Sequence, residues 1–126
     1  MKYLYLLYIG LFFFSSSVIS AQPEKMSYQF VIRDAANELM KNRNVGVKIS
    51  IIQGSTAGLL VYAETHATTT NANGLATLVI GTGTVVVGAF EGISWGDGPY
   101  FIKSETDPNG GSDYTIVGVN ELLSVP

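Results

Sequence analysis

A serine between two glycines is the first candidate for chemistry in this sequence. Gly92-Ile-Ser94-Trp-Gly96 matches the G-x-S-x-G pattern, in which a strand-to-helix turn exposes a nucleophilic serine. Here a Gly-Asp-Gly-Pro turn follows in place of a helix, and the single histidine, His66, precedes the serine instead of following it. The pattern therefore predicts a structural turn, with a small secreted hydrolase as a minor alternative.

His66 lies in a polar strand end, Glu64-Thr-His66-Ala-Thr. A metal site would need further ligands at a suitable spacing, and no Asp or Glu spacing in the sequence supplies them. We therefore expect a solvated histidine, and we assign no catalytic residue, cofactor or metal to it.

Oxygen-bearing side chains gather in the Gly-rich segment 107–113. Asp107, Asn109 and Asp113 carry the oxygen ligands that calcium prefers. The alternating order and terminal glutamate of a calcium-binding loop are missing, however. These three residues are kept as weak calcium candidates, and turn formation is the favoured interpretation.

Three large aromatic residues, Phe90, Trp95 and Tyr100, fall within a short irregular stretch. Such a cluster is most often part of a protein core. The alternative is a stacking platform for a sugar, built from Trp95 and Tyr100 and serving a glycan-binding module.

Alternating apolar residues predict the elements that position these candidates. A period of two is typical of half-buried strands, and it recurs here between Gly-, Asn- and Asp-rich turns. Asn71-Ala-Asn-Gly74 predicts a hairpin pairing 60–70 with 75–80, and the best helical candidate, 35–40, is one or two turns at most. Six to eight short strands predict an all-β fold, a single antiparallel β-sandwich of the immunoglobulin-like or transthyretin-like type. The clearest strands are 26–33, 45–53, 60–70, 75–80, 100–106 and 114–119.

The start of the chain has the order of an export signal. A positive Met1-Lys2 precedes an apolar run over 3–14, and small polar residues then lead to Ala21. A membrane-spanning helix needs roughly 20 apolar residues, and this run is shorter. We expect residues 1–21 to be a signal peptide and residues 22–126 to be a secreted or cell-surface domain, with no transmembrane segment after cleavage.

The composition limits the classes of protein that remain. The chain has 126 residues, 13% of them charged, a formal net charge of −3 and no cysteine. Without residues 1–21, 105 residues with a net charge of −4 remain, which is enough for one domain. The acidic balance argues against nucleic acid as a partner. The lack of cysteine excludes a disulfide scaffold, a cysteine zinc site and a thiol nucleophile.

An ordered set of motifs across the mature chain resembles a known family, the N-terminal β-sandwich module of secreted surface proteins common in Bacteroidetes. In that family the module precedes a collagen-like, tail-fibre-like or repeat-bearing stalk, whereas this chain stops at Pro126. The resemblance carries over no catalytic residue. The motifs are Met26-Ser-Tyr28-Gln29, Arg33-Asp34, the strand Val47 to Gln53, Thr69-Thr-Asn-Ala-Asn-Gly74-Leu75, Ile80-Gly-Thr-Gly83, Phe90, Ile93-Ser-Trp95, Gly98-Pro-Tyr100-Phe-Ile-Lys103, Asp107 and Leu122-Leu-Ser-Val-Pro126.

Residues and resemblance together predict a non-enzymatic module, the head or spacer of a cell-surface or fibre-like protein, with adhesion as one role. Its partners would be other protein segments, bound by edge-strand pairing or by the apolar tail residues Leu122, Leu123 and Val125. The alternative is a glycan-binding module that uses Trp95 and Tyr100.

Overall fold

The structure is a computed structural model that describes residues 25–123. The expected signal peptide at 1–21 and the expected contact residue Val125 lie outside the described residues. Within 25–123, no helix has the length and apolar character needed to cross a lipid bilayer.

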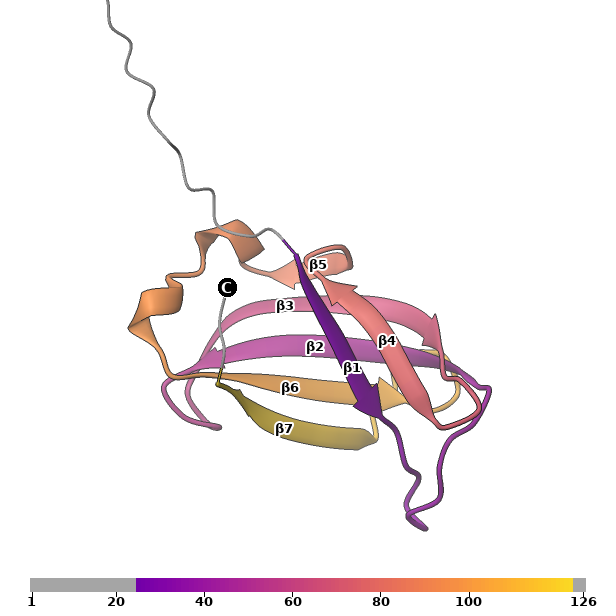
Figure 1. Cartoon of the computed structure of the whole chain (residues 1–126). Coiled ribbons are helices and arrows are strands. Elements are labelled where there is room, and N and C mark those ends of the chain that lie inside the picture. The colour runs from indigo at the N-terminus through magenta and orange to yellow at the C-terminus, as the bar shows by residue number, and fades with distance from the viewer. Residues whose placement is uncertain (1–24, 124–126) are drawn as a thin grey trace, which may run out of the picture.

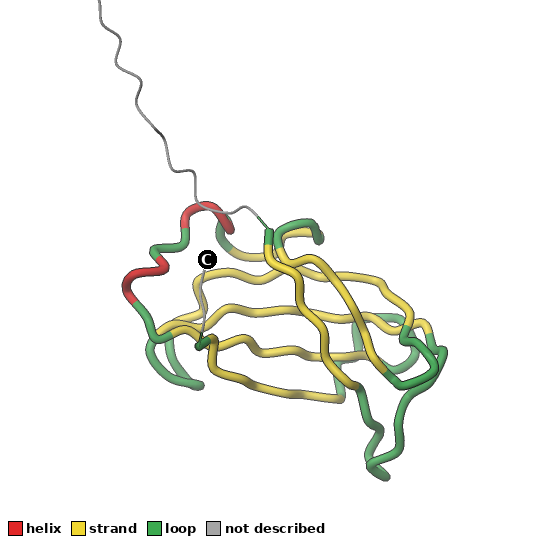
Figure 2. Tube along the Cα trace, in the orientation of Figure 1, coloured by secondary structure: helices red, strands yellow, loops and turns green. Residues whose placement is uncertain are grey.

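Two antiparallel sheets pack face to face, which confirms the predicted all-β sandwich (Figure 1). In the larger sheet the order is β5 (Thr84–Val87), β3 (Leu59–Thr69), β2 (Asn44–Gln53), β6 (Tyr100–Asp107) and β7 (Ile116–Leu122). The smaller sheet pairs β1 (Met26–Val31) with β4 (Leu75–Ile80). Two 3-10 turns, η1 (Phe90–Gly92) and η2 (Trp95–Asp97), lie together at one end of the sandwich (Figure 2).

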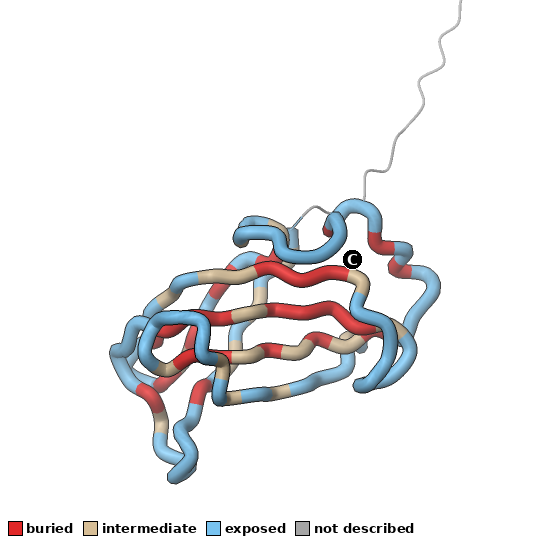
Figure 3. Tube along the Cα trace, turned by 180° about the vertical axis from the view of Figure 1, so that it is seen from behind, coloured by how far each residue is buried: buried red, intermediate tan, exposed pale blue. Residues whose placement is uncertain are grey.

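The core forms around β2, the central strand of the larger sheet. Val45, Val47, Ile49 and Ile51 are at most 1% exposed, and they belong to the same apolar cluster as the inward residues of β4. β-Branched side chains suit this position because they pack well on a pleated surface. Figure 3 shows that buried segments run along the middle strands, whereas most of the turns and loops are exposed.

The predicted hairpin between β3 and β4 is wrong, because β4 pairs with β1 and β3 pairs with β2 and β5. The turn itself has the expected chemistry. Asn71 Oδ1 accepts hydrogen bonds from the N–H groups of Asn73 and Leu75 at 2.8 and 3.0 Å, and Gly74 has a φ of 73°. This turn carries the chain from one sheet to the other. Alternation identifies the buried face of a strand but does not select its neighbour.

The helical candidate at 35–40 contains no helix. The Asp34 carboxylate accepts hydrogen bonds from the N–H groups of Ala36 and Glu38, both at 2.9 Å, and holds a tight loop instead. Such local bonds from an aspartate compete with helix formation, and here they prevail over a short segment.

The central position of β2 predicts a large cost for a cavity there. Ile49→Ala should lower the free energy of unfolding by about 2–5 kcal/mol, because the side chain is fully buried. Urea unfolding measures this. Val86→Ala, at a side chain that is 53% exposed, is the control and should change stability by less than about 0.5 kcal/mol. Equal effects of the two substitutions would contradict the assigned core.

Candidate functional site

A fully buried carboxylate, that of Glu64 on β3, is the most unusual polar feature of the described chain. Its Oε1 accepts hydrogen bonds from the Tyr62 hydroxyl and, at 2.8 Å, from the Gly81 N–H. Its Oε2 accepts from His66 Nε2 and, at 3.2 Å, from the Gly83 N–H. Four donors thus surround one carboxylate, as a buried charge requires. We call Tyr62, Glu64, His66, Gly81 and Gly83 the Glu64 network.

Two local features of the chain assemble the Glu64 network. Side chains alternate along a strand, so Tyr62, Glu64 and His66 share one face of β3. The turn at 81–83 leaves β4 in the smaller sheet and enters β5 in the larger one, and it brings two N–H groups to that face. Gly83 permits the approach, since a Cβ there would lie 2.5 Å from the Thr65 carbonyl oxygen. The network therefore ties the two sheets together.

Electrostatics reinforce the donor role of Tyr62. Burial, followed by the hydrogen bond to Glu64 and the charges of Glu64 and Glu91, raises the pKa of the Tyr62 hydroxyl far above its usual value. The hydroxyl accordingly keeps its proton and donates to Glu64 at all physiological pH values.

The prediction of a solvated His66 is wrong, because its side chain is only 11% exposed and it bonds to Glu64. The sequence held a signal for this, since Glu64 and His66 share the alternating face of Tyr62, a core residue. With both carboxylate oxygens engaged by donors, the Glu64 network can hold a fold but offers no open acceptor to a substrate.

Ser94 does not meet His66. The serine lies between η1 and η2, and its carbonyl oxygen accepts a 2.6 Å hydrogen bond from the Tyr100 hydroxyl. The strand register places His66 in the row of Thr106, six residues along β6 from Tyr100. At about 3.3 Å per residue these rows are about 20 Å apart. No serine–histidine pair is formed, and the serine is followed by the short 3-10 turn η2 in place of the α-helix that a nucleophile elbow requires.

Trp95 and Tyr100 are 6% and 2% exposed and do not form an open stacking platform. Tyr62, Phe90, Trp95 and Tyr100 instead form a continuous series, with ring centroids 5.4, 5.7 and 5.1 Å apart. Such edge and tilted contacts are favourable in a core. Burial, together with the charge of Asp97, raises the pKa of Tyr100. The aromatic cluster closes one end of the sandwich.

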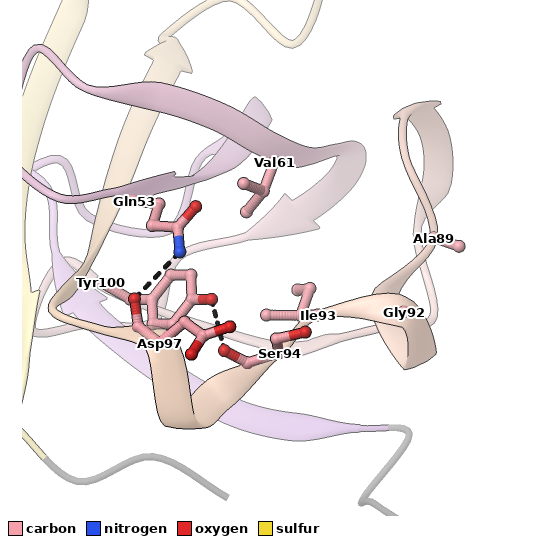
Figure 4. Close-up of a pocket in the computed structure, with 8 residues that line it drawn as sticks. All are labelled: Gln53, Val61, Ala89, Gly92, Ile93, Ser94, Asp97 and Tyr100. Atoms are coloured by element: carbon pink, nitrogen blue, oxygen red, sulfur yellow. Dashed lines mark hydrogen bonds between the residues drawn. The ribbon is translucent and has the colours of Figure 1, made fainter.

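A pocket of about 320 Å³ lies beside this cluster (Figure 4). One of its polar groups, the Gln53 side-chain amide, donates a 2.9 Å hydrogen bond to the Asp97 carbonyl oxygen, which holds η2 against β2. The two hydrogen bonds drawn in Figure 4, from Gln53 to Asp97 and from Tyr100 to Ser94, stabilise the turn that forms the pocket wall. The pocket is lined by Gln53, Val61, Ala89, Gly92, Ile93, Ser94, Asp97 and Tyr100.

The calcium candidates form a turn in place of a ligand set. Asp107 is buried, and its two carboxylate oxygens accept hydrogen bonds from the N–H groups of Asn109 and Asp113, both at 2.9 Å. These bonds lower the pKa of the Asp107 carboxyl, although burial opposes them. The Arg43 guanidinium donates to the Pro108 carbonyl oxygen at 3.0 Å, which places a cation at this loop. Within residues 25–123, no three His, Cys, Asp or Glu side chains are grouped to hold a metal ion.

The edges of the larger sheet carry apolar residues that the sequence pattern does not single out. β7 exposes Val117 and Val119, at 55% and 38%, and β5 is exposed along its whole length. Of the predicted tail contacts, Leu122 is half-buried and Leu123 is 87% exposed. Within the described residues, no strand pairs with the outer edge of β7 or of β5.

One family model matches most of the chain. Residues 27–118 match the model of a domain of unknown function, DUF8740. The chain belongs to this family. The match spans β1 to the middle of β7, so the Glu64 network and the Asp107 turn both lie inside the DUF8740 domain. Neither the curated proteins nor the solved structures include a match to the chain.

The Glu64 network predicts a specific loss when its charge is removed. Glu64→Gln keeps the shape but leaves fewer acceptors for four donors, so the free energy of unfolding should fall by about 2–4 kcal/mol. Amide hydrogen exchange at Gly81 and Gly83 should accelerate in the same variant. Glu121→Gln, at an exposed residue, is the control. Unchanged exchange at both glycines would contradict the proposed tie between the sheets.

Asp107 predicts a defined pH dependence of stability. Its pKa is lower in the folded than in the unfolded state, so its stabilisation is present above about pH 4 and is lost as the pH falls through the folded-state pKa. The stability difference between wild type and Asp107→Asn should therefore shrink as the pH is lowered from 7 to about 2. Denaturant titrations at several pH values measure it. Asp113→Asn is the matched control, because Asp113 contributes its N–H to this turn. A difference that grows on acidification would refute the assignment.

Proposed function

We propose that the chain is a non-enzymatic, exported interaction module that binds other protein segments through the free edge of β7. The exposed apolar residues on this regular edge carry the proposal. β7 pairs with β6 over seven residues without a register shift, and Glu121 is its only charged residue. Monomeric proteins usually protect such an edge with charges, prolines or bulges.

The other edge of the larger sheet suits a partner less well. β5 has four residues, and its pairing with β3 shifts register between Ala63 and Glu64. Such irregularities twist an edge and limit the addition of a strand. β7 is thus the longer and more regular template for an added strand.

Export is supported by the order of charge, apolar run and small residues in 1–21. The motif resemblance to surface modules supports a place as head or spacer in a cell-surface or fibre-like protein. A glycan-binding role is not favoured, because Trp95 and Tyr100 are buried. A hydrolase is not favoured either, because Ser94 and His66 lie far apart along the sheet.

A charge on the β7 edge tests this function. In the cell of origin, wild-type chain from the exported fraction should migrate in assemblies on native gels. Val119→Lys should release it as free chain, because a lysine on an edge strand opposes pairing. Val31→Lys is the matched control, at a residue of β1 that is 52% exposed, and should leave the assemblies intact. A wild-type chain that is retained in the cytoplasm, or exported only as free chain, would refute the proposal.

A further inference from the structure

The outer edge of β7 is complementary to itself. An antiparallel strand pair has a two-fold axis, so two copies of one edge strand can pair with each other and place each residue opposite a defined residue of the second copy. We propose that β7 binds β7 of a second copy around a two-fold axis at Gly118, which joins two five-stranded sheets into one. This inference rests on the proposed use of the β7 edge and names the partner.

Apolar matching selects the axis at Gly118. When Gly118 faces Gly118 of the second copy, Val117 lies opposite Val119 of that copy. By symmetry, Val119 also lies opposite Val117 of the second copy, so two valine pairs form. Both valines are exposed in the single chain, and both lie on the outward face of the sheet. Cross-strand pairs of β-branched residues stabilise sheets. Gly118 itself brings no side chain to the centre, where the two backbones approach each other.

The charges along the edge agree with the same axis. Glu121, the one charged residue of β7, falls opposite Thr115 of the second copy, so the two carboxylates do not face each other. On β6, Lys103 is the neighbour of Val119, and Glu105 is the neighbour of Val117. A row of neighbouring side chains across the junction therefore runs from Lys103 through Val119 of one copy to Val117 and then Glu105 of the other copy. Lys103 and Glu105 lie 3.9 Å apart within each chain, so the charges beside the junction are balanced and bring no like charges together in this register.

The size of the contact sets how it must be detected. A seven-residue strand pair is smaller than the interface of a typical stable complex, so the pairing should depend on concentration. Covalent trapping suits such a contact, and the chain has no cysteine that would interfere. Directly opposed residues of an antiparallel pair come close enough for a disulfide.

The test mixes two single-cysteine variants of the purified chain under mild oxidation. Val117→Cys mixed with Val119→Cys should give a mixed disulfide dimer about tenfold faster than Val117→Cys mixed with Val31→Cys, because pairing raises the effective concentration of the thiols. Val31 matches Val117 in exposure, at 52% against 55%. Equal rates in the two mixtures would overturn the proposal. Faster dimerisation of Val119→Cys alone would overturn the axis at Gly118.

This experiment separates the inference from the function on which it rests. Assemblies that depend on Val119 in the cell, together with no enhanced cross-linking of the purified chain, would assign the edge to a different protein. The second-copy proposal would then fail while the interaction module stands. If the Val119→Lys test and the cross-linking test both fail, the interaction module and the second-copy proposal are both refuted.

Discussion

The carboxylate of Glu64 needs hydrogen-bond donors on every side, because a buried charge without partners is among the costliest features of a protein interior. Its own strand supplies two donors, Tyr62 and His66, and the turn at 81–83 supplies two more. That turn joins the smaller sheet to the larger one. Satisfying one carboxylate therefore fixes the point where the chain passes between the layers and where β5 begins.

The two ends of the sandwich are closed by different chemistry. At one end, aromatic rings from β3, η1, η2 and β6 pack in series, with Trp95 between Phe90 and Tyr100. At the other end, the Asp107 carboxylate organises the turn before β7 through backbone N–H groups. This turn lies against β2 so closely that a Cβ at Gly46 would be 2.0 Å from the Gly111 carbonyl oxygen. The candidates for sugar and calcium binding thus act as structural closures.

Among the polar side-chain atoms buried within residues 25–123, only the Trp95 indole N–H lacks a hydrogen-bond partner, and the open strand edges of the sheets remain available for function. The core draws most large apolar residues inward, yet Val117 and Val119 remain outside on a strand whose outer edge has no described neighbour. A regular edge with a single charged residue favours recognition through the backbone, in which hydrogen bonds give affinity and opposed side chains select the register. In the proposed function, the domain presents the β7 edge to a partner.

Local patterns in the sequence determined the strands, the all-β class and the turn chemistry of Asn71, Asp107 and Gly74, because period-two alternation and turn preferences depend on nearby residues. They also favoured core positions for Trp95 and Tyr100. Only the tertiary structure decided that β4 pairs with β1, that Glu64 and His66 face the interior, and that β7 stays open. These outcomes depend on contacts between segments distant in sequence, such as the approach of Gly81 and Gly83 to Glu64, and no local pattern records them.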